Sequence, residues 1–128
     1  MDEFQLINKY FLPLTSSEGQ SLKNDAAVIV PKSNLEYVIS TDTLIETIHF
    51  NGNETPKLLA QKALRVNLSD LAAMGADPEF YSLALSIPKR NADNFLRSFT
   101  KGLSIDQNTF HIKLIGGDLT SSPKLISI

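Results

Sequence analysis

Residues 56–88 have the sequence PKLLAQKALRVNLSDLAAMGADPEFYSLALSIP, and this stretch decides the class of fold. From Pro56 to Met74 the chain contains no internal helix breaker and is dominated by Ala, Leu, Lys and Arg, with a proline suited to the first turn. Gly75, followed by Ala-Asp-Pro, forms a strong helix stop. Apolar and smaller residues then alternate from Glu79 to Ile87, which predicts a strand. A long helix followed by a strand predicts layers of helices on a sheet.

The rest of the chain extends this pattern in both directions. Apolar residues at helical spacing predict a short amphipathic helix over residues 3–11 and a longer helix over residues 91–105. Compact apolar runs bounded by turn-forming residues predict further strands. These strands are expected over residues 26–30 and 35–40, which a turn at 31–34 joins into a hairpin, and over residues 110–115 and 125–128. We therefore expect one α+β domain of mixed α/β layers that comprises residues 1–128.

The composition argues against several classes of function. A net charge of −2 and the lack of a Lys/Arg cluster argue against a nucleic-acid surface. With no cysteine and two histidines, any metal ion is expected to be a hard cation held by carboxylates. No apolar run approaches the ~20 residues of a membrane span, and the acidic start MDEF is unlike a signal peptide, so we expect a cytoplasmic protein without a membrane partner.

Several aspartates stand beside the predicted elements, where loops let side chains converge. The four that carry the hypothesis are Asp25, Asp42, Asp70 and Asp118. Asn67 precedes the third of them by one helical turn and shares its helix face. Converging carboxylates repel one another and need a cation, and Mg²⁺ combines carboxylates with substrate phosphates. Gly116-Gly117 predicts a loop whose backbone N–H groups a phosphate can approach closely.

Each of these signals also has a purely structural interpretation. An aspartate beside a strand is commonly a turn former, and Gly-Gly-Asp alone more often makes a tight turn than a ligand site. His49 is then a solvated loop residue, and His111 belongs to one face of a strand. The interpretation as a phosphate and metal site depends on the whole set of residues.

Five segments in the same order carry a resemblance to a known family. They are EFQLINKYFLPL (3–14), NDAAVIV (24–30), STDTLIETIHF (40–50), KALRVNLSDLAAMGADP (62–78) and LIGGDLTSS (114–122). Together they resemble the N-terminal part of the thiamine-monophosphate kinase family, within the aminoimidazole-ribonucleotide-synthetase-like superfamily. The segment VNLSDLAAMGA, together with TDTL and HF, favours the kinases over their superfamily relatives.

The resemblance implies a fold, an assembly and a reaction. It implies a four-stranded mixed sheet packed on helices, which dimerises through the sheet into a barrel-like core. It also implies transfer of a phosphoryl group from ATP to thiamine monophosphate, with several Mg²⁺ ions, giving thiamine diphosphate. Such a transfer needs little covalent help but much positioning and charge neutralisation, which agrees with a carboxylate-rich site.

The resemblance also implies roles for particular residues of this sequence. The metal ligands would be Asp25, Ser40, Thr41, Asp42, Asp70 and Asp118. Among these, Asp42, Asp70 and Asp118 would form the catalytic set. His49 would contact thiamine monophosphate, and Gly117 with Asp118 would contact ATP.

Two departures from the family pattern leave alternatives open. Lys23-Asn24-Asp25-Ala26 stands where the family usually has Gly-Asp-Asp-Ala, which should weaken cation binding in that loop. Family members also resemble two-domain enzymes, and the C-terminal domain is absent from these 128 residues, so we expect the chain alone to be inactive. The alternatives are a truncated or degenerate, non-catalytic dimerising module, or a superfamily relative that phosphorylates another small molecule.

Overall fold

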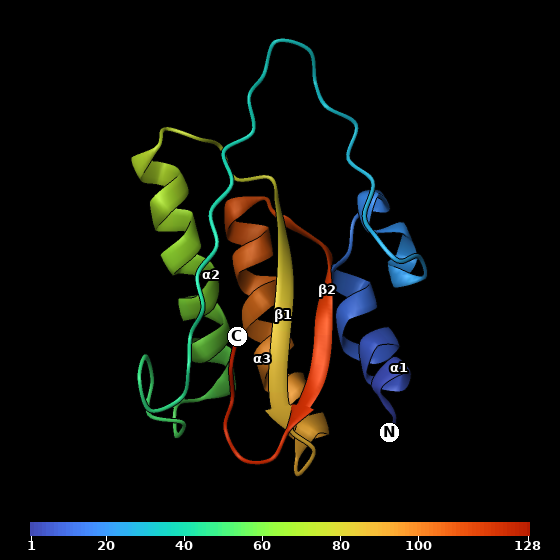
Figure 1. The fold of residues 1–128 in the computed structure, drawn as a ribbon, viewed down its shortest axis with the longest axis vertical. Helices are drawn as coiled ribbons and strands as arrows, with labels where there is room; N and C mark the ends of the chain where they lie inside the picture. The colour runs from blue at the N-terminus through green and yellow to red at the C-terminus, as the bar shows by residue number, and fades with distance from the viewer.

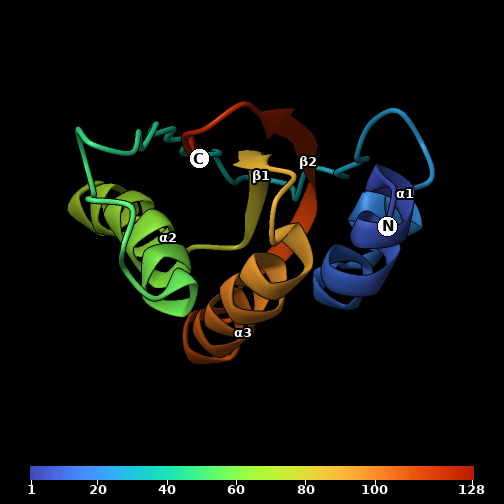
Figure 2. The same cartoon turned by 90° about the horizontal axis from the view of Figure 1, so that it is seen from below.

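Helices line one face of a small sheet, as the two perpendicular views in Figures 1 and 2 show. The structure is a computed structural model that describes all of residues 1–128. Its elements are α1 (Glu3–Leu6), a π-helical turn (Ile7–Phe11), 3₁₀ turns (Leu12–Leu14 and Ser17–Leu22), α2 (Pro56–Ala73), β1 (Phe80–Pro88), α3 (Ala92–Phe110) and β2 (Lys113–Ser122). None of the helices has the length and apolarity that a membrane crossing needs.

The sheet consists of two parallel strands, β1 and β2, joined through α3. Parallel neighbours need a crossover connection, and α3 supplies it. Short backbone contacts cover the outer edges: the Ser16 N–H donates to the Leu114 carbonyl of β2, at 3.2 Å, and Ser127 exchanges two hydrogen bonds with Ser86 of β1. The expected C-terminal strand is thus reduced to isolated bridges at the edge of β1.

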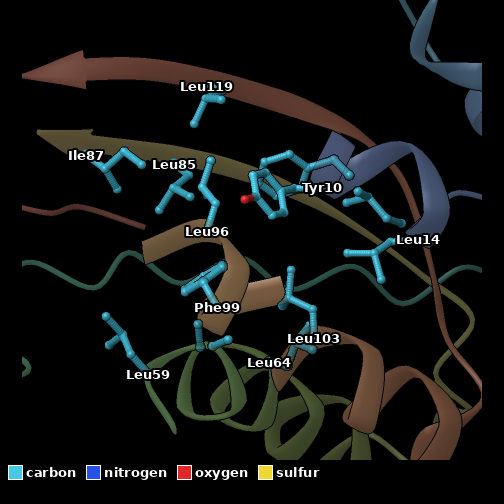
Figure 3. Packing of buried hydrophobic residues seen from close by; sticks show 14 of the residues in the cluster. Tyr10, Leu14, Leu59, Leu64, Leu85, Ile87, Leu96, Phe99, Leu103 and Leu119 are labelled. Atoms are coloured by element: carbon cyan, nitrogen blue, oxygen red, sulfur yellow. The ribbon is translucent and has the colours of Figure 1, made fainter. Parts of the chain in front are cut away.

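The hydrophobic core lies between the sheet and the helices (Figure 3). Leu85, Ile87 and Leu119 point from the sheet toward α3, whose Leu96 and Phe99 are fully buried. Burying a side chain of this size contributes roughly 1.5–3 kcal/mol. The alternation expected in β1 is confirmed, because Leu85 and Ile87 are buried while Ser82 and Ala84 on the other face are exposed.

A close crossing and a buried ion pair join α2 to α3. A Cβ at Gly102 of α3 would lie 2.2 Å from the carbonyl oxygen of Lys57, so only glycine fits this crossing. Asp106 of α3 is completely buried and accepts two hydrogen bonds from Arg65 and one from Gln61, each at 3.0 Å. A buried carboxylate needs such partners, so this network fixes the position of α2 on α3.

The predicted helices are largely confirmed. α2 and β1 match their predicted ranges to within a residue, and the N-terminal helix is present, with a π-helical second half. α3 continues to Phe110, beyond the predicted end at residue 105, because Asp106 and Gln107 are buried polar side chains with partners inside the fold. His111 was wrongly assigned to a strand face; it ends α3 in the left-handed conformation, at φ 56°.

The four-stranded sheet and the N-terminal hairpin are wrong. Residues 26–30 and 35–40 belong to no strand, and most of this segment is exposed; in Figure 1 it rises as an extended arm above the sheet. The turn between them is present, with Asn34 at φ 62°. Apolar, β-branched sequence favours an extended backbone, but a strand also needs a neighbouring strand to pair with. The backbone of residues 26–40 makes only one backbone hydrogen bond, from the Val28 N–H to the Glu18 carbonyl.

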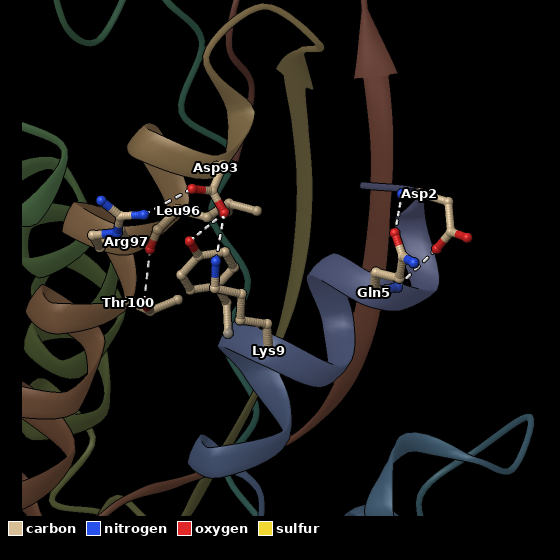
Figure 4. Close-up of polar contacts among 8 residues, drawn as sticks. Asp2, Gln5, Lys9, Asp93, Leu96, Arg97 and Thr100 are labelled. Atoms are coloured by element: carbon tan, nitrogen blue, oxygen red, sulfur yellow. Dashed lines mark hydrogen bonds and ion pairs between the residues drawn. The ribbon is translucent and has the colours of Figure 1, made fainter.

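The N-terminal helical segment is tied to α3 by a polar cluster around Asp93 (Figure 4). The Asp93 carboxylate accepts a hydrogen bond from the Tyr10 hydroxyl at 2.5 Å and pairs with Lys9 and Arg97, each at 2.9 Å. The hydrogen bond from Tyr10, with that from Lys9, lowers the pKa of Asp93 below its ordinary value of 3.8. The charged form of this carboxylate therefore stabilises the fold.

We predict that Gly102→Ala lowers the free energy of unfolding by about 1–3 kcal/mol, because the new Cβ would collide with the Lys57 carbonyl. An ordinary exposed helical glycine responds in the opposite direction, gaining about 1 kcal/mol. Urea unfolding measures the change, and Lys101→Ala, at the neighbouring exposed position, is the control. An unchanged or increased stability for Gly102→Ala would contradict this close crossing.

We predict that the stabilising effect of Asp93 depends on pH. Its folded pKa lies below 3.8, so its contribution is complete above that pH and is lost as the pH falls through the folded pKa. Asp93→Asn should therefore lose less stability than the wild type between about pH 5 and about pH 2. Urea unfolding across this range tests it, with the exposed Asp77→Asn as control. Parallel pH profiles for wild type and Asp93→Asn would rule the effect out.

Candidate functional site

A pocket of about 270 Å³ lies beside β2 and gathers two of the four aspartates. Asp25 lines it from the segment after the second 3₁₀ turn, and Asp118 lines it from β2. Its other walls combine backbone-rich and apolar residues: Asn24, Ile7, Phe11, Leu22, Leu83, Leu114, Gly116 and Gly117, among others. The pocket is therefore lined by both carboxylates and apolar side chains.

Gly116 and Gly117 belong to a strand, which corrects the predicted loop. β2 runs through both glycines, and the register slips between Tyr81 and Ser82, so that Ser82 pairs with Gly116. Gly117 adopts φ 149°, and a Cβ there would lie 1.8 Å from the carbonyl oxygen of Leu83. Glycine is thus required by the close approach of β1, and the same absence of a side chain leaves backbone open toward the pocket.

A second group of oxygen atoms forms where α2 passes residue 40. The Ser40 hydroxyl donates to Asp70 Oδ2 at 3.3 Å and lies 3.5 Å from Asn67 Oδ1. The Asn67 amide nitrogen donates to the Ala63 carbonyl at 3.1 Å, which turns its oxygen toward Ser40. The predicted sharing of one helix face by Asn67 and Asp70 is therefore seen in the structure.

The other predicted site residues lie on the segment after Ser40. Thr41 and Asp42 are exposed, and the structure gives their side chains no hydrogen bond or ion pair. His49 is also exposed, and its Nδ1 accepts a hydrogen bond from the Ile45 N–H at 2.9 Å. No three His, Asp or Glu side chains lie close enough together to hold a metal ion. The structure thus places Asp25 and Asp118 in the lining of one pocket and brings Ser40 into contact with Asp70, as two separate groups.

Several residues of these sites carry no recognisable signal in the sequence. Phe11 and Leu22 look like ordinary core residues of the N-terminal segment, yet they line the pocket because that segment packs along β2. Lys62 looks like a solvated lysine on α2, yet its ammonium group donates to the backbone carbonyl of His49. Only the packing of distant segments brings these side chains to the site.

The donor atoms present suit a hard cation in chemical terms. Each group provides carboxylate oxygens, supplemented by a hydroxyl at Ser40 and an amide oxygen at Asn67. Mg²⁺ is commonly held by one or two carboxylates together with substrate phosphates and water, so two aspartates in one group and one in the other are compatible with it. A hard cation held by these oxygen atoms would neutralise the charge of a phosphate group.

Residues 23–128 match the family described as AIR synthase related protein, N-terminal domain, and the chain belongs to that family. Its curated relatives include thiamine-monophosphate kinases: the enzyme of Buchnera aphidicola subsp. Schizaphis graminum is 44% identical over 131 residues, covering 99% of this chain and 40% of the relative. The chain therefore spans about 40% of the length of that relative. The predicted resemblance to this kinase family is confirmed.

Solved structures agree with this assignment. Thiamine-monophosphate kinase from Stenotrophomonas maltophilia K279a is 39% identical, with a TM-score of 0.74 over 83% of this chain and 33% of that one. AaThiL complexed with AMPPCP and TMP is 29% identical, with a TM-score of 0.63 over 67% of this chain and 28% of that one.

The two adjacent glycines of β2 make a matched pair for a test. We predict that Gly117→Ala destabilises the fold much more than Gly116→Ala, because a Cβ at position 117 meets the Leu83 backbone while nothing lies within 4 Å at position 116. Their φ angles are similar, 149° and 158°, so the difference isolates the steric contact. Urea unfolding measures both variants. Equal losses would show that the close approach of the strands does not require glycine.

Proposed function

We propose that this chain is the N-terminal part of an ATP- and Mg²⁺-dependent thiamine-monophosphate kinase, which converts thiamine monophosphate to thiamine diphosphate. The observation that supports it best is the pocket that Asp25, Asp118 and the two glycines of β2 line together, in a chain whose relatives carry that name. AaThiL, one of the similar proteins, is complexed with AMPPCP and TMP.

In this proposal the pocket beside β2 receives ATP. Gly117 and Asp118 contact the nucleotide, and Asp25 with Asp118 holds the Mg²⁺ that neutralises its phosphates. The apolar wall, with Phe11 and Leu22, suits the uncharged part of a nucleotide. Backbone N–H groups at glycine positions can approach phosphate oxygens, which side chains would keep away.

The remaining proposed metal ligands lie in or near the second group of oxygen atoms, formed by Ser40, Asn67 and Asp70. Ser40 and Asp70 are already in contact, and Thr41 and Asp42 follow on the same segment. Asp42, Asp70 and Asp118 form the catalytic set because they hold the cations that place the reacting phosphates. Mg²⁺ supplies charge neutralisation when bound, and the attacking phosphate oxygen is ionised at neutral pH, so no histidine is needed as a base. His49 instead contacts the phosphate of thiamine monophosphate.

The chain also has a surface suited to dimerisation. The face of β1 that carries Ser82 and Ala84 is exposed, and so are Val30 and Ile39 of the extended arm, at 81% and 86%. Exposed apolar groups next to an open sheet face favour association. We propose that two copies associate through this face, as the barrel-like dimer implied by the family resemblance requires.

A non-catalytic module is the second candidate. It is favoured by the separation of the proposed ligands: Asp25 and Asp118 line one pocket, Ser40 and Asp70 lie in another group, and no three carboxylate or histidine side chains gather. In our proposal these 128 residues supply only part of the metal and nucleotide contacts that the reaction needs. The purified chain alone should then bind Mg²⁺–nucleotide but make no thiamine diphosphate.

Isothermal titration of the chain with Mg²⁺–ATP tests the proposal. Binding is expected, and Asp118→Asn should weaken it by about tenfold or more, equivalent to about 1.4 kcal/mol or more, because a carboxylate that neutralises phosphate charge through Mg²⁺ is lost. Asp77→Asn, at an exposed aspartate outside the pocket, is the control. Absence of heat up to millimolar Mg²⁺–ATP would leave the non-catalytic module as the better description.

A further inference from the structure

The segment from Leu44 to Phe50 is an exposed turn fixed at both ends. Leu44 and Phe50 are buried, at 4% and 5% exposure, and anchor the turn in the core. Within it the His49 N–H donates to the Ile45 carbonyl at 2.9 Å, and the Thr47 N–H donates to the Phe50 carbonyl at 2.7 Å. The start of the turn is also bonded to the C-terminal segment, because Leu44 exchanges two backbone hydrogen bonds with Ile128 and the Glu46 N–H donates to the Ile126 carbonyl. His49 lies at the exposed far end of the turn, away from these bonds.

The ring of His49 is oriented by the backbone of the same turn. Its Nδ1 accepts the Ile45 N–H at 2.9 Å. A nitrogen that accepts a hydrogen bond carries no proton, so the neutral ring has its proton on Nε2. The exposed side chain thus offers Nε2–H as a hydrogen-bond donor, which is the polarity that an anionic group requires.

Lys62 connects this turn to α2. Its ammonium group donates to the backbone carbonyl of His49 itself. Lys62 precedes Asp70 by eight residues, which is about two helical turns, so both project from one helix. α2 is in turn fixed to α3 by the bonds from Arg65 to the buried Asp106. The Lys62 contact therefore links the backbone of His49 directly to the helix that carries Asp70.

We propose that Lys62 is a positioning residue for the phosphate-bearing substrate: it ties the Leu44–Phe50 turn to α2, so that the Nε2–H of His49 is held in a fixed relation to Asp70. The inference rests on the proposed function, in which His49 contacts thiamine monophosphate. Loss of the Lys62 donor frees the His49 carbonyl and loosens the turn, so the ring loses its single orientation.

The free protein provides a direct readout of this arrangement. The chain has two histidines, and His111→Asn removes the other one at a left-handed position that asparagine tolerates. In ¹⁵N-labelled His111→Asn protein, long-range ¹H–¹⁵N spectra should show the His49 ring as the Nε2–H tautomer. Lys62→Met should give a mixture of tautomers, while Lys62→Arg keeps a donor and the single tautomer. Lys57→Met, at an exposed lysine of the same helix, should change nothing.

Binding of thiamine monophosphate in the presence of Mg²⁺ and a non-hydrolysable ATP analogue completes the test. Lys62→Met should weaken it about fivefold, the equivalent of about 1 kcal/mol, while Lys62→Arg restores it. A single His49 tautomer in Lys62→Met would overturn the proposal. If His49→Ala weakens binding but Lys62→Met does not, the substrate contact stands and the role of Lys62 is refuted. If neither variant changes the affinity, the proposed substrate contact of His49 itself is wrong, and with it the inference.

Discussion

The close parallel approach of β1 and β2 is the constraint on which the rest of the structure depends. Gly117 has no side chain, so the two backbones pass at a distance that any Cβ would prevent. The two strands present their apolar faces together, and α3 buries its stripe of Leu96 and Phe99 against them. Gly117 also lines the pocket, so the absence of a side chain at this position of β2 matters for both the core and the candidate site.

Helix α2 packs on α3 and carries two of the residues that the proposed function uses, Asp70 and Lys62. Gly102 permits its close crossing with α3, and the buried Asp106 fixes it through Arg65. From this fixed helix Asp70 reaches Ser40, and Lys62 reaches the His49 turn. Residues that belong to separate motifs are thus brought to one side of a single helix. Their mutual placement depends on apolar packing that contains none of the proposed ligands.

Much of the fold could be predicted because its signals are local. The boundaries of α2 follow from Pro56 and Gly75, and the alternation of β1 predicted which residues would be buried. The conformation of residues 26–40 could not be predicted correctly. Apolar β-branched runs indicate an extended backbone, but they do not show whether another strand is available to pair with it. Gly116-Gly117 was interpreted as a loop for a similar reason: glycine indicates close approach or a turn, and only the neighbouring Leu83 shows which.

The sequence by itself determined the α+β class, the principal elements, the family resemblance and the shared helix face of Asn67 and Asp70, because each depends on periodicity or on motifs read along the chain. Only the tertiary structure decided that Asp25 and Asp118 share a pocket, that Thr41 and Asp42 lie apart from it, and that Lys62 contacts the His49 turn. These relations join residues far apart in sequence, and they arise from the packing of α3 between α2 and the sheet, which no local pattern specifies.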